Sequence, residues 1–409
     1  MNIERAYPFA IVTEKCHKRT SNGHPWIYDN EIVTPPVNAA DGDIVDVFTE
    51  KRRYIGSGFY NSNSKIRVRI ISRSANDSFD DDFWRRRVEY AYRYRKTVMT
   101  ADELDCCRLV FGEADFIPGL TVDRFHDLLS VQILCLGTEK RRDIILSALE
   151  DVLKADGRPI KGIYLRNDVN IRRLEGMDEE KGWYSYSTDV PPSPVTRITE
   201  NGIIYEVDVE NGQKTGFFLD QKRNRRAAAS IAAGKNVLDC CTHTGSFALN
   251  AAAAGAAHVH AIDISQTALD SAQKNAVLNG LSDRMSFEKA DVFDALRARI
   301  AAHDRSADYI ILDPPAFTKS RKTVGSAGKG YLELNTLAMR LLPRGGYLAT
   351  ASCSHFMTER LFLEMLSKAA HDANVSLRQI DYRRQCADHP ILLSVEETDY
   401  LKFFIFQVV

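Results

Sequence analysis

A cysteine and an aspartate in the last quarter of the chain have the residue types and settings of a reactive pair. Cys353 and Asp313 each follow a short hydrophobic run, and Asp313 is itself followed by Pro314 and Pro315. A cysteine thiolate is a strong nucleophile. The two prolines restrict the backbone around Asp313, so its carboxyl group is held extended at the end of a strand. If the two strands are neighbours in one sheet, these side chains face each other across a few ångströms.

Three further aspartates follow earlier hydrophobic runs and should reach the same edge of a sheet. Asp263 comes 24 residues after Asp239, close to the separation at which a ribose-binding carboxylate occurs in nucleotide-binding folds. Asp239 could hold a cationic amine, and a side chain near Asp291 could meet the edge of an adenine. A single aspartate at a strand end is usually a helix N-cap or a turn residue, but three on successive strands favour a ligand site.

The turn after the first of these strands lacks the glycines of a dinucleotide site. Thr244 and Gly245 belong to the segment 239–247, which holds a single glycine. A pyrophosphate is typically bound by the pattern G-x-G-x-x-G, because backbone N–H groups must approach the phosphates. The segment therefore disfavours NAD and FAD. It favours a cofactor with a ribose and an amino-acid end but no phosphate.

Strands and helices that alternate from residue 220 onward position these side chains. The periodicity predicts strands over 236–240, 259–263, 285–289, 309–312 and 347–352, helices over 220–232, 245–254, 267–278, 332–341 and 359–370, and two closing strands. Such alternation predicts an α/β fold with a parallel sheet covered by helices on both faces. Ligands then bind at the carboxyl ends of the strands.

Two smaller domains are predicted before this sheet. Alternating hydrophobic residues broken by glycine indicate a small, mostly β module over residues 1–75. Mixed helical and strand patterns indicate an α+β domain over 76–190. The segment 191–194, Pro-Pro-Ser-Pro, is the clearest linker, and the sheet-forming domain follows it over 191–409.

Composition narrows the class of protein. The chain has 409 residues, 44% hydrophobic and 27% charged, with a net charge of −1, so any nucleic-acid contact must come from local basic runs rather than bulk charge. Such runs occur at 51–53, 85–87, 223–226 and 321–322, although each could equally be a solvated surface. No transmembrane stretch or signal peptide is recognised. Eight cysteines without metal-ligand spacing favour a reducing compartment. We expect a cytoplasmic protein without a metal.

In this order, the motifs resemble those of class I S-adenosylmethionine-dependent methyltransferases. More closely, they resemble the RlmI-type large-subunit ribosomal RNA cytosine-5 methyltransferases, along nearly the whole chain. Residues 24–27, His-Pro-Trp-Ile, resemble that family's N-terminal PUA domain, an RNA-binding β-barrel. Residues 112–123 resemble its central domain, residues 212–223 the segment entering its cofactor pocket, and residues 388–390, Asp-His-Pro, its C-terminal signature.

The resemblance implies methyl transfer from S-adenosylmethionine to C5 of a cytosine in 23S ribosomal RNA. In that chemistry Cys353 would add to C6, and Asp313 would bond the N3/N4 edge of the base. The implied cofactor-binding residues are Asp220, Arg223, Asp239, Thr244, Gly245, Asp263 and Asp291. The implied RNA-contacting residues are Pro314, Phe317, Lys319, Arg321 and Lys322.

Departures from the family pattern leave alternatives open. Some cytosine-5 enzymes carry a second cysteine beside the Asp-Pro-Pro motif, where this chain has Ala316 and Phe317, so the base that removes the C5 proton is not identified. The motif also resembles that of enzymes methylating exocyclic amines of adenine or guanine, although Cys353 argues against them. A non-catalytic RNA-binding assembly factor and a small-molecule methyltransferase are further alternatives. The target nucleotide, the choice between naked RNA and a large-subunit precursor, and a homodimeric state stay open.

Overall fold

The chain divides into two compact units, each built from several segments. The computed structural model describes residues 6–317 and 324–409. The first unit comprises Met1–Ile198, Val207–Leu219 and Ala387–Thr398, and the second comprises Thr199–Glu206, Asp220–Cys386 and Asp399–Val409. The chain therefore passes between the units several times. The domain boundaries that the sequence suggests after residues 75 and 190 stay predictions.

The first unit opens with a six-stranded sheet in the order β2-β6-β5-β4-β1-β3. Its strands are β1 (Phe9–Val12), β2 (Trp26–Tyr28), β3 (Ile32–Thr34), β4 (Ile44–Thr49), β5 (Tyr54–Tyr60) and β6 (Ile66–Ser72). Helix α1 (Glu14–Ser21) begins where the Thr13 hydroxyl accepts the N–H of Cys16. Val45, Val47 and Val68 are fully buried in the core of this module.

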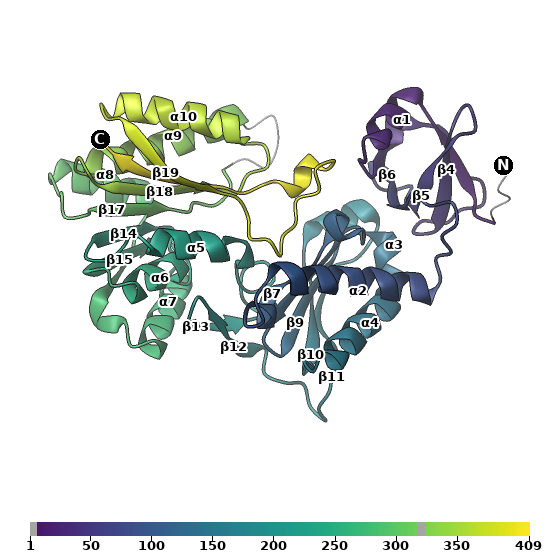
Figure 1. Ribbon diagram of the computed structural model, residues 1–409, viewed down its shortest axis with the longest axis horizontal. Helices are drawn as coiled ribbons and strands as arrows, with labels where there is room; N and C mark the ends of the chain where they lie inside the picture. Colours follow the sequence, from purple (N-terminus) through teal and green to yellow (C-terminus); the bar gives the residue numbers. More distant parts are fainter. Residues whose placement is uncertain (1–5, 318–323) are drawn as a thin grey trace. The chain divides into compact units, whose positions relative to one another are not determined.

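A second sheet of the first unit has the order β11-β10-β9-β8-β7. Its strands are β7 (Cys106–Phe111), β8 (Leu120–Phe125), β9 (Leu128–Ile133), β10 (Gly162–Asn167) and β11 (Glu180–Tyr186). Helices α2 (Asp81–Val98) and α4 (Arg142–Ala155) pack side by side (Figure 1). Short α3 (Leu136–Glu139) follows β9. This part is therefore α+β, as predicted from its mixed pattern.

Hydrogen bonds attach two later segments to the first unit. The Arg166 guanidinium donates to the carbonyl oxygens of Val209 and Gly212 at 3.0 and 2.8 Å. The backbone N–H of Arg108 donates to the carboxylate of Asp388 at 2.9 Å. Residues predicted to belong to the methyltransferase-like domain therefore pack in the first unit, because its interior supplies their hydrogen-bond partners.

A hairpin of β12 (Val195–Glu200) and β13 (Ile203–Asp208) precedes the second unit's large sheet. Its turn is the Asn-Gly pair seen in the sequence. Asn201 and Gly202 have φ of 55° and 80°, the left-handed conformations that a two-residue hairpin turn requires.

The second unit is built on a seven-stranded sheet in the order β16-β15-β14-β17-β18-β20-β19. Its strands are β14 (Asn236–Cys240), β15 (His258–Asp263), β16 (Met285–Lys289), β17 (Tyr309–Leu312), β18 (Tyr347–Ser352), β19 (Leu377–Arg383) and β20 (Lys402–Val408). The first five are parallel, and β20 runs antiparallel to β18 and β19. The predicted α/β sheet is confirmed, with an antiparallel pair at one edge.

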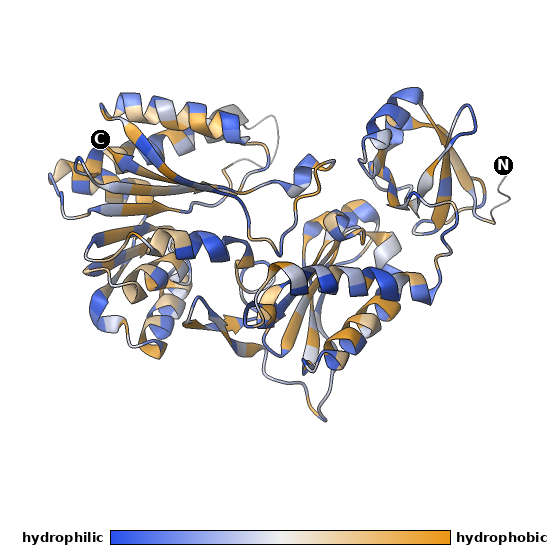
Figure 2. Ribbon diagram, in the orientation of Figure 1, coloured by the Kyte–Doolittle hydropathy of each residue, from blue (hydrophilic) through white to orange (hydrophobic). Residues whose placement is uncertain are grey.

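Helices cover both faces of this sheet (Figure 1). One face carries α5 (Lys222–Ala229), α6 (Ser246–Ala253) and α7 (Gln266–Leu278), and the other carries α8 (Val292–Ala301), α9 (Val324–Leu341) and α10 (Glu359–Asp372). Hydrophobic residues run along the strands (Figure 2), and Ile310, Leu312 and Leu348 are fully buried. Within the described ranges, no helix is long and apolar enough to cross a membrane.

Candidate active site

The turn between β14 and α6 has an unusual backbone. Cys241, His243 and Gly245 have φ of 62°, 51° and 80°, in the left-handed region that residues with a β-carbon seldom adopt. At Gly245 a β-carbon would lie 3.0 Å from the β-carbon of Ala272, so glycine is required there for space as well as for conformation. The turn at the carboxyl end of β14 therefore stays tight.

Asp239 is the most deeply buried carboxyl group at this edge, with 1% of its surface exposed. One of its oxygens accepts the Thr242 hydroxyl at 2.6 Å and the Ala248 N–H at 3.0 Å. The other is buried and has no hydrogen-bond partner among the described residues. Burial, supplemented by the charges of Asp313 and Asp263, raises the pKa of Asp239 to about 7. A buried oxygen of this kind favours a ligand that brings a proton donor or a positive charge.

Asp263 and Asp291 both hold backbone amides. The two oxygens of Asp263 accept the N–H groups of His243 and Ser265, each at 2.9 Å. An ionised carboxylate has about four acceptor positions, so two stay available for ribose hydroxyls. Asp291 caps α8, where one oxygen accepts two backbone N–H groups at 2.9 and 3.2 Å. This is the helix-cap role considered for a single aspartate, and its contact with adenine stays a prediction.

Thr244 and Asp220 complete the surroundings of the predicted cofactor site. The Thr244 hydroxyl oxygen is buried and has no hydrogen-bond partner among the described residues. The Asp220 carboxylate accepts the Tyr400 hydroxyl at 2.7 Å, and its carbonyl accepts the N–H of Cys386 at 2.8 Å. Arg223, the second residue of α5, is half-buried. These contacts anchor the segment before α5 to the segment before β20.

Two amide side chains that the sequence did not single out support Asp313. The side chain of Gln221 donates to an Asp313 carboxylate oxygen at 2.9 Å. The side chain of Asn224 donates to the Gln221 amide oxygen at 2.6 Å. Both are almost fully buried. The i, i+3 spacing of Gln221 and Asn224 at the start of α5 is a sequence signal for the bond between these two side chains. No local signal links Gln221 to Asp313, which is 92 residues away.

Cys353 and Asp313 follow neighbouring strands. Leu312 pairs with Thr350 in parallel register. Asp313 and Cys353 therefore lie just beyond the carboxyl ends of β17 and β18. Cys353 is half-buried. The serines on either side of it are buried, and the Ser352 hydroxyl donates to the hydroxyl of Tyr331 at 3.1 Å. The neighbouring strands were predicted correctly, whereas the short separation of the two side chains stays a prediction.

A second half-buried cysteine, Cys241, lies at the same edge. Burial and the charges of Asp263 and Asp313 raise the pKa of its thiol far above the ordinary value. Cys241 therefore stays protonated and weakly nucleophilic. The other six cysteines, apart from Cys353, are buried. From the sequence, each cysteine is first interpreted as a small core residue. This interpretation fits Cys240, but it does not predict that Cys241 lies at the site.

The predicted RNA-contacting residues differ in their surroundings. Pro314 is buried. Phe317 packs edge-on against Tyr331 with ring centroids 4.6 Å apart and lies 6.2 Å from the ring of Phe293. Lys319, Arg321 and Lys322 lie outside the described residues.

The basic runs are used in different ways. Residues 51–53 are exposed between β4 and β5. Arg85 forms an ion pair with Asp151 at 2.7 Å. Arg225 is buried and makes two bonds to Glu200 at 2.6 and 2.8 Å. Arg225 therefore has a structural role, and the RNA contact of residues 51–53 stays a prediction.

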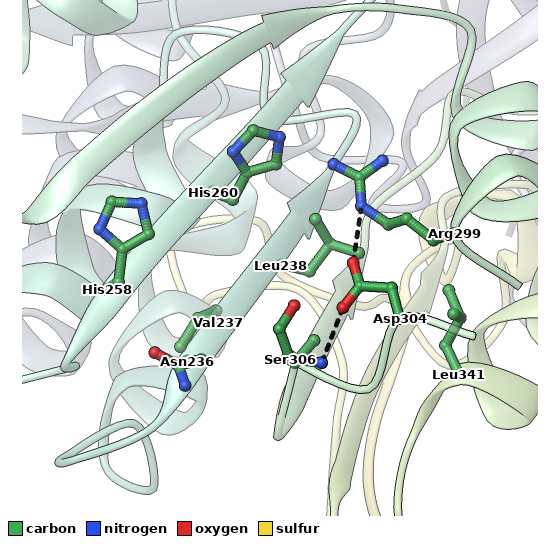
Figure 3. Close-up of a pocket in the computed structure, with 10 residues that line it drawn as sticks. Asn236, Val237, Leu238, His258, His260, Arg299, Asp304, Ser306 and Leu341 are labelled. Carbon is green, nitrogen blue, oxygen red and sulfur yellow. Dashed lines mark hydrogen bonds and ion pairs between the residues drawn. The ribbon is translucent and has the colours of Figure 1, made fainter. Parts of the chain in front are cut away.

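A cavity of about 410 Å³ lies elsewhere in the second unit (Figure 3). It is lined by residues at the amino-terminal ends of β14 and β15, including Asn236 and His258, together with Arg299 and Asp304. The aspartates and Cys353 follow the carboxyl ends of the strands, so this cavity is not part of the candidate site. In the described part of the chain, no group of three His, Cys, Asp or Glu side chains could hold a metal ion.

Comparison with known proteins agrees with this geometry. Residues 180–402 match the S-adenosylmethionine-dependent methyltransferase family, and residues 10–73 match the PUA-like domain. Ribosomal RNA large subunit methyltransferase I of Erwinia tasmaniensis is 38% identical over 400 residues, which cover 98% of this chain and 99% of the relative. The protein of that name from Aeromonas hydrophila is 40% identical over 380 residues, 93% of this chain and 94% of its own.

Solved structures share the fold. An S-adenosylmethionine-dependent methyltransferase from Streptococcus mutans superposes with a TM-score of 0.81 at 23% identity, covering 98% of this chain and 100% of its own. A methyltransferase complexed with SAH gives a TM-score of 0.83 with the same identity and coverage. The cofactor is S-adenosylmethionine, and the chain belongs to the S-adenosylmethionine-dependent methyltransferases, in the family of ribosomal RNA large subunit methyltransferase I.

Proposed function

We propose that this protein methylates C5 of a cytosine in large-subunit ribosomal RNA. The names of its relatives support the RNA substrate. One observation carries the C5 assignment: Cys353 is half-buried beyond β18, next to the strand that carries Asp313. Methylation at C5 needs such a nucleophile because this carbon is itself a poor one. Addition of a thiolate at C6 makes C5 reactive.

The carboxyl groups at the sheet edge suit a positively charged cofactor. When bound, S-adenosylmethionine supplies an electrophilic methyl group on a cationic sulfur. Asp239, with its buried oxygen that lacks a partner among the described residues, is our candidate for the amino-acid end, together with Thr244 and Gly245. Asp263 would hold the ribose, and Asp291 would lie near the adenine. Asp220 and Arg223 would flank the site.

Cys353 and Asp313 divide the chemistry at the base. The Cys353 thiolate would form a bond to C6 and so make C5 nucleophilic. C5 would then take the methyl group as the bond between that group and the cofactor's sulfur breaks, with the electron pair of that bond left on the sulfur. Asp313 holds the N3/N4 edge of the cytosine, which keeps the base in place and favours the addition. A base then removes the C5 proton, the S–C6 bond breaks, and Cys353 is restored. Gln221, bonded to Asp313, would fix the orientation of its carboxylate.

The packing of Phe317 weighs against methylation of an exocyclic amine. In that chemistry the aromatic residue of the Asp-Pro-Pro motif stacks on the target base. Here the partly buried Phe317 ring packs edge-on against Tyr331, at the margin of the hydrophobic core. This packing restricts the freedom of the ring to turn and stack on a base.

The PUA-like residues 10–73 would position the RNA, with contacts from the exposed residues 51–53. Lys319, Arg321 and Lys322 would add contacts to phosphates near the base. A cytosine inside a helix must be flipped out to reach the strand edge. We expect this to occur in the cytoplasm, on naked RNA or on a large-subunit precursor.

Bisulfite sequencing of ribosomal RNA tests the proposal. In cells with the gene, one cytosine of the large-subunit RNA should resist conversion, and it should convert in cells lacking the gene. Wild-type protein should restore protection, and Cys353→Ala should not. Cys16→Ala is the control and should restore protection, because this cysteine lies in the core of the PUA-like module and outside the candidate site. Full protection with Cys353→Ala would contradict the thiolate mechanism. If cells lacking the gene instead lose a methyl group from an adenine or guanine of this RNA, the amine alternative is favoured.

A further inference from the structure

Lys402 is a buried lysine beside the proposed nucleophile. It is the first residue of β20, has 3% of its surface exposed, and pairs across the sheet with Ser352. Its ammonium group donates to the carbonyl oxygen of Ser354 at 2.6 Å and to that of Tyr400 at 2.9 Å. Ser352 and Ser354 are the neighbours of Cys353 in the chain. The lysine side chain therefore holds the backbone directly after the cysteine.

Burial of this charge is unfavourable for folding. Lysine is almost never fully buried unless it is paired. Burial lowers the pKa of Lys402 to about 8, although the negative charges of Asp399 and Cys353 act to raise it. The side chain is therefore mostly charged at neutral pH. A hydrophobic residue at the start of β20 would avoid this cost. A functional role accounts for the lysine better than stability does.

In the described part of the chain, two of the three protons of the Lys402 ammonium group have a partner. An ammonium group has three N–H donors, and two of them bond the carbonyl oxygens of Ser354 and Tyr400. On the other side of Cys353, the Ser352 hydroxyl is held by Tyr331. The cysteine thus lies in a backbone segment fixed at both ends, with a buried positive charge near it.

We propose that Lys402 is a positioning residue for Cys353, which fixes the backbone after the cysteine and stabilises its thiolate through a buried ammonium group. The inference rests on the proposed function of Cys353. When the thiolate forms, its proton passes to solvent, and Lys402 keeps its own three protons. The contrast with Cys241, which lies among carboxylates, explains which of the two half-buried cysteines at this edge reacts.

Other titratable groups surround this pair. Asp399 attracts Lys402 and Arg384 repels it, but these two pair with each other at 3.1 Å, so their effects on Lys402 largely cancel. Burial raises the pKa of Tyr331 to about 12, so it is neutral at working pH. The carboxylate of Asp313 opposes a thiolate, and His355 lies two residues after Cys353. Lys402 is therefore the group expected to favour the thiolate.

The pH dependence of Cys353 alkylation tests the proposal on the full-length protein without RNA or cofactor. Iodoacetamide labelling is followed by peptide mass spectrometry from pH 5 to about 10, a range that spans the ordinary cysteine pKa of about 8.5. The wild-type midpoint should lie below that value. Lys402→Met should raise it by about one pH unit or more, because it removes a buried opposite charge that interacts with Cys353. Lys402→Arg should restore most of the shift, and the exposed Lys368→Met is the matched control.

Equal midpoints in wild type and Lys402→Met would overturn the proposal, as would an arginine variant that behaves like the methionine variant. A purely structural lysine would lower thermal stability without moving the midpoint. If Lys402→Met does not fold, the wild-type value decides, since a midpoint above about 8.5 contradicts a stabilised thiolate. Failure of the proposed function would give a different result. No covalent RNA adduct would form, while the alkylation midpoints of wild type and Lys402→Met would still differ.

Discussion

Replacement of Asp239 by asparagine should stabilise the cofactor-free protein while weakening cofactor binding. The carboxyl group is buried, with one oxygen bonded to Thr242 and Ala248 and the other without a partner among the described residues. One amide oxygen of asparagine can accept both of those bonds. Asp239→Asn therefore can keep these two bonds, and it replaces the second carboxylate oxygen and the buried charge by a neutral NH2 group.

The magnitude follows from the pKa of Asp239, which rises from 3.8 to about 7 on folding. A raised carboxyl pKa means that the folded state binds the proton more tightly, so the associated stability is present below pH 3.8 and is lost as pH rises through 7. About three units at about 1.4 kcal/mol each give an upper limit of about 4 kcal/mol. At pH 8 we expect the variant to be more stable by about 2–4 kcal/mol, and at pH 4 the two proteins should differ by less than about 1 kcal/mol.

Hydrogen exchange of the β14 amides, corrected for the intrinsic rate at each pH, measures this local stability. Fluorescence is the internal control, because Trp26, Trp84 and Trp183 all lie in the first unit and should report no change. Calorimetry should show that the variant binds S-adenosylmethionine at least about tenfold more weakly, the loss expected for one charged hydrogen bond. An equally or less stable variant at pH 8, or a difference that does not change with pH, would refute the reasoning.

Three further predictions concern the cofactor, the target base and the RNA. Asp263→Ala should cost about 2–3 kcal/mol of S-adenosylmethionine affinity, since charged acceptors form the stronger hydrogen bonds, and an unchanged dissociation constant would exclude the assignment. Gln221→Leu removes the amide that holds Asp313 and should lower kcat about tenfold with the cofactor dissociation constant within about twofold, whereas unchanged kcat would show that this bond is dispensable. RNA affinity should fall as salt rises, and the double variant Lys51→Glu, Arg53→Glu should weaken binding and reduce that salt dependence. If the slope of log affinity against log salt concentration is the same in the variant, residues 51–53 are not part of the RNA interface.

Local patterns predicted much of the second unit. The strands predicted over 236–240, 285–289, 309–312 and 347–352 have those bounds in the structure. Of these, β14, β17 and β18 are mostly buried on both faces and read as short hydrophobic runs between turns, which makes their ends easy to recognise. Because parallel strands end at one edge, the pattern also predicts that their aspartates lie close together.

Contacts between distant parts of the chain were not predictable. The segment Ala387–Thr398 packs in the first unit because Asp388 accepts the N–H of Arg108, 280 residues earlier. The bond between Gln221 and Asp313 likewise depends on how α5 meets the sheet. Neither partner has a local signal for the other, since side-chain hydrogen bonds of this kind are set by tertiary packing.

The two half-buried cysteines show the same limit at the site. The adjacent Cys240 and Cys241 look alike in the sequence, yet Cys240 is fully buried. The left-handed backbone at Cys241 instead directs that side chain toward a group of carboxylates. Lys402 resembled any other strand residue in the sequence. Its importance depends on its pairing with Ser352, which only the antiparallel placement of β20 creates.

Trapping with 5-fluorocytosine tests the central claim most directly. Large-subunit ribosomal RNA containing this base is mixed with the protein and S-adenosylmethionine, and covalent complexes are isolated under denaturing conditions. Fluorine at C5 cannot leave as a proton, so the adduct between the enzyme and C6 should persist. We predict a wild-type adduct whose cross-linked peptide contains Cys353, and none with Cys353→Ala, whose cofactor affinity should be nearly unchanged. Absence of an adduct with active wild-type protein, or near-normal methyl transfer by Cys353→Ala, would contradict the account.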